Sequence, residues 1–256
     1  MTFKDFIFLI IILGIGFAVL LVYAEMRVQK TLSEKRLAAA EKFKATLNSL
    51  PTVDVKIDAS AERHLNQYGS YQVTTSGLRK NTKVSTISDF VAIDIETSGL
   101  SPRSNEILSV SAVRFINQKP VELFFTYVRP RRGIPAEATQ INGITESDVS
   151  DAPYFEQVIE SLSDFIGKST VVAHNIYFDM RFIYHEGLDL GDKRKYFDTL
   201  ELSRLYDKDA DSHKLSDACS MHGVELGDSA HGSSADALAC GMLFAKYIED
   251  VVGVTA

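Results

Sequence analysis

The sequence predicts an α/β domain, a mixed sheet flanked by helices, that follows an N-terminal transmembrane helix. Three observations predict this arrangement. The first is an uncharged apolar run near the N terminus, and the second is a strand-like alternation that begins at Asp89. The third is the order of the expected elements from there on: three strands, then alternating helices and short strands. The chain has 256 residues, of which 45% are hydrophobic and 24% are charged. This ordinary globular composition excludes collagen-like, disulfide-scaffold and wholly disordered chains.

The apolar run covers residues 6–24 and reads FIFLIIILGIGFAVLLVYA, 19 residues without a charge. As a helix it would be about 28 Å long, close to the ~30 Å of the hydrocarbon core of a bilayer. We therefore predict a membrane anchor over residues 1–24. The alternative is a cleaved signal peptide, because Val22-Tyr23-Ala24 has the small residues that a signal peptidase requires, although the run exceeds the usual ~7–15 apolar residues.

A basic segment follows this run and predicts the orientation of the anchor. Its cations are Arg27, Lys30, Lys35, Arg36, Lys42 and Lys44. The positive-inside tendency then places the rest of the chain on the cytoplasmic side of the inner membrane, as a single-pass protein. Residues 25–50 are rich in Ala, Glu, Lys and Leu, which predicts a helical stalk that Pro51 ends. Residues 51–88 are polar without a sustained period and predict a linker or extension.

The charges are divided unevenly along the chain. Residues 1–87 carry 12 Lys and Arg against 7 Asp and Glu, whereas residues 88–256 carry 15 against 27, a balance of −12. An acidic domain is a poor non-specific clamp for phosphates, but acidic clusters suit divalent cations. The two cysteines, Cys219 and Cys240, form no Cys-x-x-Cys pair, which excludes a zinc ribbon and a redox dithiol.

Residues 89–256 are predicted to form the globular domain. We expect strands over 89–96, 105–115 and 121–128, with a tight turn at Asn117–Pro120, then a helix over 154–166, a strand over 170–174, a helix over 176–187 and two C-terminal helices. Three meandering strands followed by helix–strand alternation predict a mixed sheet covered by helices.

The first strand carries two acids. In the segment DFVAIDIE, Val91, Ile93 and Ile95 alternate with Ala92, Asp94 and Glu96. Asp94 and Glu96 therefore project from the same side of the strand, about 6.5–7 Å apart along it. Acidic side chains in an apolar strand are costly unless a partner neutralises them, and a divalent metal would do so. The other interpretation is a strand whose polar face meets water.

A second cluster lies in VVAHNIYFDMRFI, residues 171–183. Asn175 is expected to cap a helix that starts at Ile176, which places Asp179 in the first or second turn, near the positive end of the helix dipole. Phe178 and Phe182 share a face, so they either pack in the core or, for Phe178, contact a base. His174 is expected to be a hydrogen-bonded residue at the end of a strand and not a metal ligand.

A third cluster lies in HGSSADALACGMLFAKYI, residues 231–248. Helical spacing of the apolar residues, with Ser233 or Ser234 as cap, places Asp236 in the first turn. His231 precedes Gly232 and belongs to a loop. A loop histidine with a pKa near ~6.5 is able to accept a proton near neutral pH, although most loop histidines are ordinary surface residues.

These clusters match a known family in order and spacing. The motifs are Asp94-x-Glu96-Thr97-x-Gly99-Leu100, His174-Asn175-x-x-Phe178-Asp179, and His231 followed five residues later by Asp236. The chain thereby resembles the DEDD 3′→5′ exonucleases of the histidine subclass, and within them the epsilon proofreading subunit of bacterial DNA polymerase III and its stand-alone relatives. The resemblance covers about residues 89–250 and implies a ribonuclease H-like fold for the domain over 89–256.

The resemblance also implies a chemistry. Asp94, Glu96, Asp179 and Asp236 would hold two Mg²⁺ or Mn²⁺ ions, and His231 would accept the proton of the attacking water. The substrate would be the single-stranded 3′ end of a nucleic acid, DNA or RNA, from which nucleoside 5′-monophosphates are released. The terminal nucleotide would be bound by Thr97, Leu100, Asn175 and Phe178.

The chain departs from the family pattern in two places. Asn142 stands where relatives often have His, and Ser111 stands where they often have Gly. Neither position is one of the five central residues. Besides a membrane-anchored exonuclease, two functions remain open: a catalytically weak, tethered nucleic-acid-binding module, and a secreted nuclease whose signal peptide has been removed.

Overall fold

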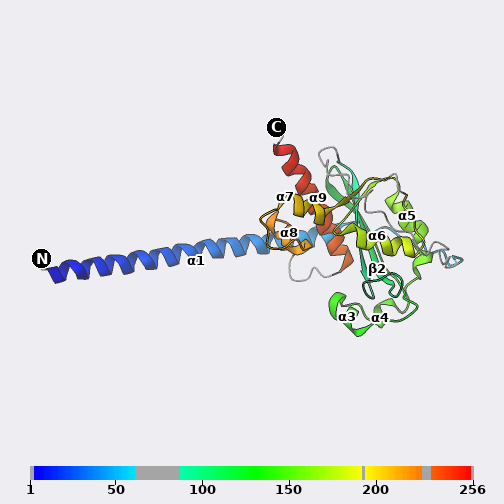
Figure 1. Cartoon of the computed structure of the whole chain (residues 1–256), viewed down its shortest axis with the longest axis horizontal. Helices are drawn as coiled ribbons and strands as arrows, with labels where there is room; N and C mark the ends of the chain where they lie inside the picture. The colour runs from blue at the N-terminus through cyan, green and yellow to red at the C-terminus, as the bar shows by residue number, and fades with distance from the viewer. Residues whose placement is uncertain (1–2, 62–86, 192–193, 227–231, 255–256) are drawn as a thin grey trace.

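The computed structural model describes residues 3–61, 87–191, 194–226 and 232–254, with side chains described for Val22 and from residue 24 to residue 250 within these ranges. A sheet of five strands forms the centre, in the order β3-β2-β1-β4-β5 (Figure 1). The strands are β1 (Phe90–Thr97), β2 (Ile107–Ile116), β3 (Lys119–Tyr127), β4 (Thr170–Ala173) and β5 (Tyr196–Asp198). The first three pair antiparallel, and β4 and β5 continue parallel to β1, which confirms the predicted mixed sheet.

Helices cover both faces of the sheet. The helix α9 (Ser233–Val254) lies across one face, with α7 (Thr199–Tyr206) and α8 (Leu215–Met221) beside it. The helices α5 (Ile159–Ile166) and α6 (Ile176–His185) and the short turn η1 (Phe155–Gln157) contribute to the core on the other face. Two further short helices, α3 (Ala136–Asn142) and α4 (Glu146–Val149), connect β3 to η1. Within the described residues three helices follow β5, one more than predicted.

The alternation of β1 divides its side chains between two cores. Phe90 and Ala92 pack toward α9, whereas Val91, Ile93 and Ile95 pack toward α5 and α6. All five of these side chains are buried, so β1 is the central strand. The tight turn between β2 and β3 is formed by Asn117 and Gln118, both with positive φ (50° and 62°), which matches the hairpin turn predicted there.

The helix α1 (Phe3–Ser49) extends away from the domain as a long rod (Figure 1). Its last turns dock onto the domain, because Phe43, Leu47 and Leu50 join the core beneath α9. The predicted helical stalk is therefore helical, and its C-terminal end is part of the packed core. Arg36 adds an ion pair of 3.8 Å to Glu225, near the end of α8.

The first part of the predicted linker lies against the sheet. The amide of Val53 donates to the carbonyl of Leu123 (3.0 Å), and the amide of Leu123 donates to the carbonyl of Pro51 (2.9 Å). These bonds cover the free edge of β3, an edge that otherwise offers unpaired amides to other chains. Lys56 then bonds through its backbone to the hydroxyl of Ser161 on α5. Residues 62–86 of the predicted linker lie outside the described residues.

Within the part of the chain that the structure describes, no helix is long and apolar enough to cross a membrane. The transmembrane helix predicted over residues 6–24 is therefore unsupported by the structure. Most of that segment precedes Val22, where the side chains lie outside the described part, so the membrane anchor stays a prediction.

The packing of α9 on the sheet generates a stability prediction at Gly241. A Cβ atom at this position would lie 2.1 Å from Cε2 of Phe115 and 3.0 Å from Cβ of Ala92. Phe115 has little room to move, because its ring stacks on Phe90 with centroids 4.6 Å apart. Gly241→Ala is expected to lower the free energy of unfolding, since overpacking costs about 1–3 kcal/mol and exceeds the gain in helix propensity of up to about 1 kcal/mol.

Urea denaturation of the purified protein measures this loss. The control is the double variant Gly241→Ala with Phe115→Leu, which frees space for the added methyl group and should recover part of the loss. Equal stability of Gly241→Ala and the natural protein would contradict the close approach of α9 to β2.

Candidate active site

Two acids lie at the end of β1, on the face that α9 covers. Asp94 and Glu96 continue the row of Phe90 and Ala92, as the alternation predicts. In the antiparallel ladder with β2, Asp94 is paired with Ser111 and Glu96 with Ser109. Both acids are half-buried. The strand therefore points two carboxylates toward the start of α9.

The third acid reaches the same place from α9. Asp236 lies in the first turn of this helix, as predicted. One oxygen of each of Asp94, Glu96 and Asp236 lies within 4.8 Å of the others. Residues about 140 positions apart in the sequence are thus brought to one point, with oxygen atoms spaced closely enough to share a metal ion.

Asp179 approaches from the opposite face of the sheet. It lies in the first turn of α6, as predicted, and is only 3% exposed. Its Oδ1 accepts a hydrogen bond of 3.2 Å from the amide of Ile95, the residue between Asp94 and Glu96. This bond fixes the Asp179 carboxylate to β1. The structure therefore brings together all four acids that the sequence singled out.

The pKa values of Asp94, Glu96 and Asp179 reflect this crowding. Burial raises the pKa of Asp94 well above its usual range, and the negative charges of Asp179, Asp236 and Glu96 raise it further. Burial and the charge of Asp236 raise the pKa of Glu96 to about 7. Burial also raises the pKa of Asp179, against the lowering effect of its hydrogen bonds to backbone amides. A cation among these carboxylates would offset both the desolvation and the repulsion.

The donor set of this cluster fits a hard divalent cation. The acids offer carboxylate oxygens, which Mg²⁺ and Mn²⁺ prefer, and neither cysteine of the chain is available, because Cys219 and Cys240 are both buried in the core. The predicted base, His231, lies outside the described residues. The described chain resumes at Gly232, whose carbonyl accepts a hydrogen bond from the amide of Asp236 (3.1 Å).

His174 is held away from this chemistry. Its Nε2 lies 3.0 Å from the carbonyl of His213 and must donate to it, so Nδ1 accepts from the hydroxyl of Thr199 (2.9 Å) in the neutral ring. Burial lowers the pKa of His174 to about 4. The prediction of a hydrogen-bonded residue at the end of a strand is thereby confirmed.

The predicted substrate-binding residues border the acids. Thr97 ends β1 and donates its hydroxyl to the carbonyl of Gly99 (2.7 Å). Leu100 is 79% exposed, and Arg181 donates to its carbonyl, which holds the loop against α6. Phe178 is half-buried, with its ring centroid 5.2 Å from that of Phe182, so the core-packing interpretation holds for at least part of its surface.

Asn175 corrects one local prediction. It occupies the N-cap position of α6, but its side chain makes no capping hydrogen bond. The reason is its left-handed backbone (φ 67°, ψ 50°), since a capping side chain reaches the first turn from an extended conformation. Instead, the backbone amide of Asn175 donates to Oδ1 of Asp198 (2.9 Å), which also accepts from the amide of Leu200.

Asp198 is an organising residue to which sequence reasoning gave no role. It lies at the end of β5 and ties the start of α6 to the start of α7. Burial raises its pKa, as expected for a carboxylate in this environment. The segment Phe197-Asp198-Thr199-Leu200 carried the signal, because an Asp directly before a helical period is a typical N-cap.

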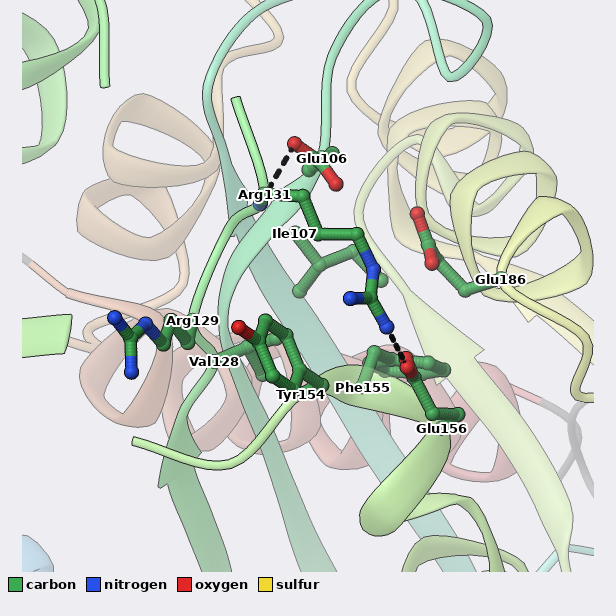
Figure 2. A pocket seen from close by; sticks show the side chains of 9 residues that line it. All are labelled: Glu106, Ile107, Val128, Arg129, Arg131, Tyr154, Phe155, Glu156 and Glu186. Carbon is green, nitrogen blue, oxygen red and sulfur yellow. Dashed lines mark hydrogen bonds and ion pairs between the residues drawn. The ribbon is translucent and has the colours of Figure 1, made fainter. Parts of the chain in front are cut away.

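A separate small hollow lies between the start of β2 and η1 (Figure 2). There the carboxylate of Glu106, only 6% exposed, accepts hydrogen bonds from the backbone amides of Arg131 (3.0 Å) and Arg132 (2.9 Å). The side chain of Arg131 extends across the hollow to an ion pair with Glu156, as Figure 2 shows. None of the predicted site residues lines this hollow, and its ion pair fastens the segment after β3 to η1.

Comparison with known proteins identifies the domain. Residues 91–244 match the sequence profile of the family described as exonuclease (RNase T). The chain is 38% identical over 163 residues to a PolC-type DNA polymerase III of Caldanaerobacter subterraneus subsp. tengcongensis, covering 63% of this chain and 12% of that protein. It is 33% identical over 165 residues to the 3′-5′ exonuclease DinG of Bacillus subtilis, covering 62% of this chain and 18% of that protein. This chain thus spans less than a fifth of the length of these two relatives.

Solved structures share the fold. Exonuclease X, in complex with 5′ overhanging duplex DNA, has a TM-score of 0.50 and 25% identity, with 63% of this chain and 92% of that chain covered. The nuclease domain of 3′hExo, a DEDDh family member bound to rAMP, has a TM-score of 0.56 and 19% identity, with 65% and 94% covered. The predicted ribonuclease H-like fold is thereby confirmed. With its profile match over more than half of its length and its four acids assembled at the end of β1, this chain belongs to the RNase T family of exonucleases.

Proposed function

We propose that the chain is a membrane-anchored 3′→5′ exonuclease that releases nucleoside 5′-monophosphates from the 3′ ends of single-stranded nucleic acid. The observation that carries the proposal is that carboxylate oxygens of Asp94, Glu96 and Asp236 lie within 4.8 Å of one another. Asp179 of α6 is held next to them by its hydrogen bond to the amide of Ile95 on β1. No purely binding role explains why four carboxylates should be crowded where a phosphate would have to approach. The carboxylates repel one another, and such an arrangement has a use only if bound cations neutralise their charges.

Exonucleases of this family use two divalent metal ions, Mg²⁺ or Mn²⁺, and the donor set of this cluster fits them. Asp94 would help to hold these ions, since the negative charges of Asp179, Asp236 and Glu96 all act on it. When bound, the ions would supply positive charge and Lewis acidity for displacement at phosphorus. The four acids would hold and orient them.

A histidine base completes the proposed chemistry, and His231 is the best candidate. His174 is excluded, because both of its ring nitrogens are bonded and burial lowers its pKa to about 4. In the sequence, His231 directly precedes Gly232, whose carbonyl accepts a hydrogen bond from the amide of Asp236 (3.1 Å). A histidine there would be able to accept the proton of the attacking water near neutral pH.

The terminal nucleotide would lie against the rim formed by Thr97, Leu100, Asn175 and Phe178. The exposure of Leu100 (79%) supports this role, since an apolar side chain that far out of the core is available to contact a base. Phe178 is half-buried next to Asp179, which leaves part of its ring open to a base close to the acids. The DNA in the complex of the similar exonuclease X supports a nucleic-acid substrate here.

Graded loss of activity in a series of variants tests the proposed mechanism. Asp94→Ala or Asp236→Ala should abolish release of mononucleotides from a labelled single-stranded oligonucleotide in Mg²⁺, because each removes a metal ligand. His231→Ala should retain the metals and lose about 10²–10⁴-fold in rate, the usual contribution of a general base. Asp217→Ala, an exposed acid in the first turn of α8, is the matched control and should cleave normally. Undiminished cleavage by Asp94→Ala would refute the metal site.

The raised pKa values predict how metal-free protein responds to pH. A carboxyl group whose pKa is raised on folding stabilises the fold below its ordinary pKa, and that stability is lost as the pH rises through the folded value, about 7 for Glu96. The melting temperature of the metal-free protein should therefore fall between about pH 5 and about pH 8. Mn²⁺ should restore it, and most strongly at the higher pH, where protons no longer compete for the oxygens.

The matched variants for this experiment are Glu96→Gln and Glu160→Gln. The first removes a crowded carboxylate and should flatten the pH dependence, whereas the second removes an exposed carboxylate on α5 and should leave it unchanged. If the metal-free protein gained stability as the pH rose over this range, and Glu96→Gln did not alter that gain, the conclusion that the acids are crowded in the folded protein would be refuted.

The anchor rests on the 19 uncharged residues over 6–24 and on the basic residues that follow them. We predict that the full-length protein remains in the inner-membrane fraction after an alkaline wash, with the nuclease domain facing the cytoplasm. Deletion of residues 1–24 should release an active enzyme into the soluble fraction. Sequencing of the mature N terminus is the control for the signal-peptide alternative: a protein that begins at Glu25 would contradict the anchor and favour a secreted nuclease.

A further inference from the structure

Four serine hydroxyls form a chain between β2 and the start of α9. Ser109 Oγ lies 2.9 Å from Ser233 Oγ, which lies 2.7 Å from Ser111 Oγ, which in turn lies 3.0 Å from Ser234 Oγ. Ser109, Ser111 and Ser233 are at most 1% exposed. Three bonds use three of the four hydroxyl protons, and the half-buried Ser234 ends the chain nearest to solvent. The chain is therefore satisfied within the core.

These hydroxyls are in register with the metal-binding acids. On β1 and β2, Asp94 is paired with Ser111 and Glu96 with Ser109, and directly paired residues project from the same face of a sheet. On α9, Ser233 and Asp236 are three residues apart and share a face of the helix. Ser233 thus lies over the two serines of β2, while Asp236 lies over the two acids of β1.

The local prediction for α9 is corrected by the same contacts. Ser233 or Ser234 is predicted to cap the helix, but α9 begins at Ser233 itself, and the Ser233 hydroxyl bonds to β2. The hydroxyl is thus used to fix the helix to the sheet. Beyond this first turn, α9 is held by apolar contacts of Ala237, Leu238 and Leu243, so the serines are not needed to keep the helix in place as a whole.

We propose that Ser233, held by Ser109 and Ser111, is a positioning residue for the metal site. The hydroxyl chain fixes the first turn of α9 at the distance from β1 where Asp236 meets Asp94 and Glu96. Metal sites tolerate displacements of only about 0.5 Å in their ligands, and loss of a supporting hydrogen bond commonly lowers metal affinity about 10–100-fold. This inference rests on the proposed nuclease function and names residues that tune its metal site.

The test separates positioning from stability by comparing single and triple variants of the full-length protein. Ser233→Ala removes the hydroxyl that Ser109 and Ser111 share, which leaves buried Ser109 without this partner and Ser111 bonded only to Ser234. It should therefore lower both the melting temperature and the affinity for Mn²⁺, the latter about 10–100-fold. The triple variant with Ala at 109, 111 and 233 leaves only the half-buried Ser234 of the four hydroxyls, at the end of the chain nearest to solvent, so it should recover most of the melting temperature. Its affinity for Mn²⁺ should stay low, because the first turn of α9 is no longer pinned.

Binding of Mn²⁺ alone, followed by electron paramagnetic resonance, gives the affinity without substrate or turnover. The matched control is Ser203→Ala on α7, which removes an equally buried hydroxyl that bonds to His213 (2.9 Å); it should lower the melting temperature and leave Mn²⁺ affinity unchanged. If the affinity of the triple variant recovers with its stability, or if Ser203→Ala weakens Mn²⁺ equally, the positioning role is refuted.

The experiment also separates this inference from the proposed function. Normal Mn²⁺ binding by both serine variants, together with loss of binding in Asp236→Asn, would refute the positioning role and leave the exonuclease intact. Failure of the natural protein to bind Mn²⁺ would refute the metal site itself. Ser111→Ala provides a second single variant if Ser233→Ala does not fold, and it should weaken Mn²⁺ in the same direction because Ser111 bonds directly to Ser233.

Discussion

Repulsion among carboxylates at the end of β1 is the constraint on which the rest of the structure depends. Asp94, Asp179 and Asp236 come from three different elements, and burial together with the charges of the neighbouring acids raises the pKa of Asp94. Such a cluster opposes folding unless the scaffold holds it or a cation neutralises it. The scaffold supplies apolar burial on both faces of β1, which is large enough to carry an unfavourable group of charges at one end of the strand.

The topology explains why the acids meet at that end. Because β1 and β4 are parallel, both strands end at the same edge of the sheet, and α6 begins there with Asp179 in its first turn. The helix α9 crosses the opposite face and starts at the same edge, which brings Asp236 over β1. Acids on the two faces of the sheet are thus joined around the end of one strand, and the bond from Ile95 to Asp179 locks the two sides together.

Periodicity and helix-start signals were sufficient to predict the four acids and the elements that carry them. The alternation of β1 placed Asp94 and Glu96 on one face, and the helix starts placed Asp179 and Asp236 in first turns. What the sequence could not reveal are contacts between distant segments. The pairing of Val53 with Leu123 and the bonds of Ser233 to β2 depend on which surfaces meet, and no local pattern encodes that choice. The predicted side-chain cap of Asn175 was wrong because the backbone of this residue is left-handed.

The docking of α1 bears on how a tethered nuclease would work. Phe43 and Leu47 of this helix pack in the core of the domain, and the helix extends from there as a continuous helical arm. From Ala24 to Phe43 the arm covers 20 residues, or about 30 Å of helix. An anchor over 6–24 would then hold the acids of β1 at a set distance from the bilayer, and substrates would have to present their 3′ ends within that zone. Because Phe43 lies in the same core cluster as Phe90 of β1 and Ala237 of α9, the orientation of the arm is fixed relative to the catalytic face of the sheet.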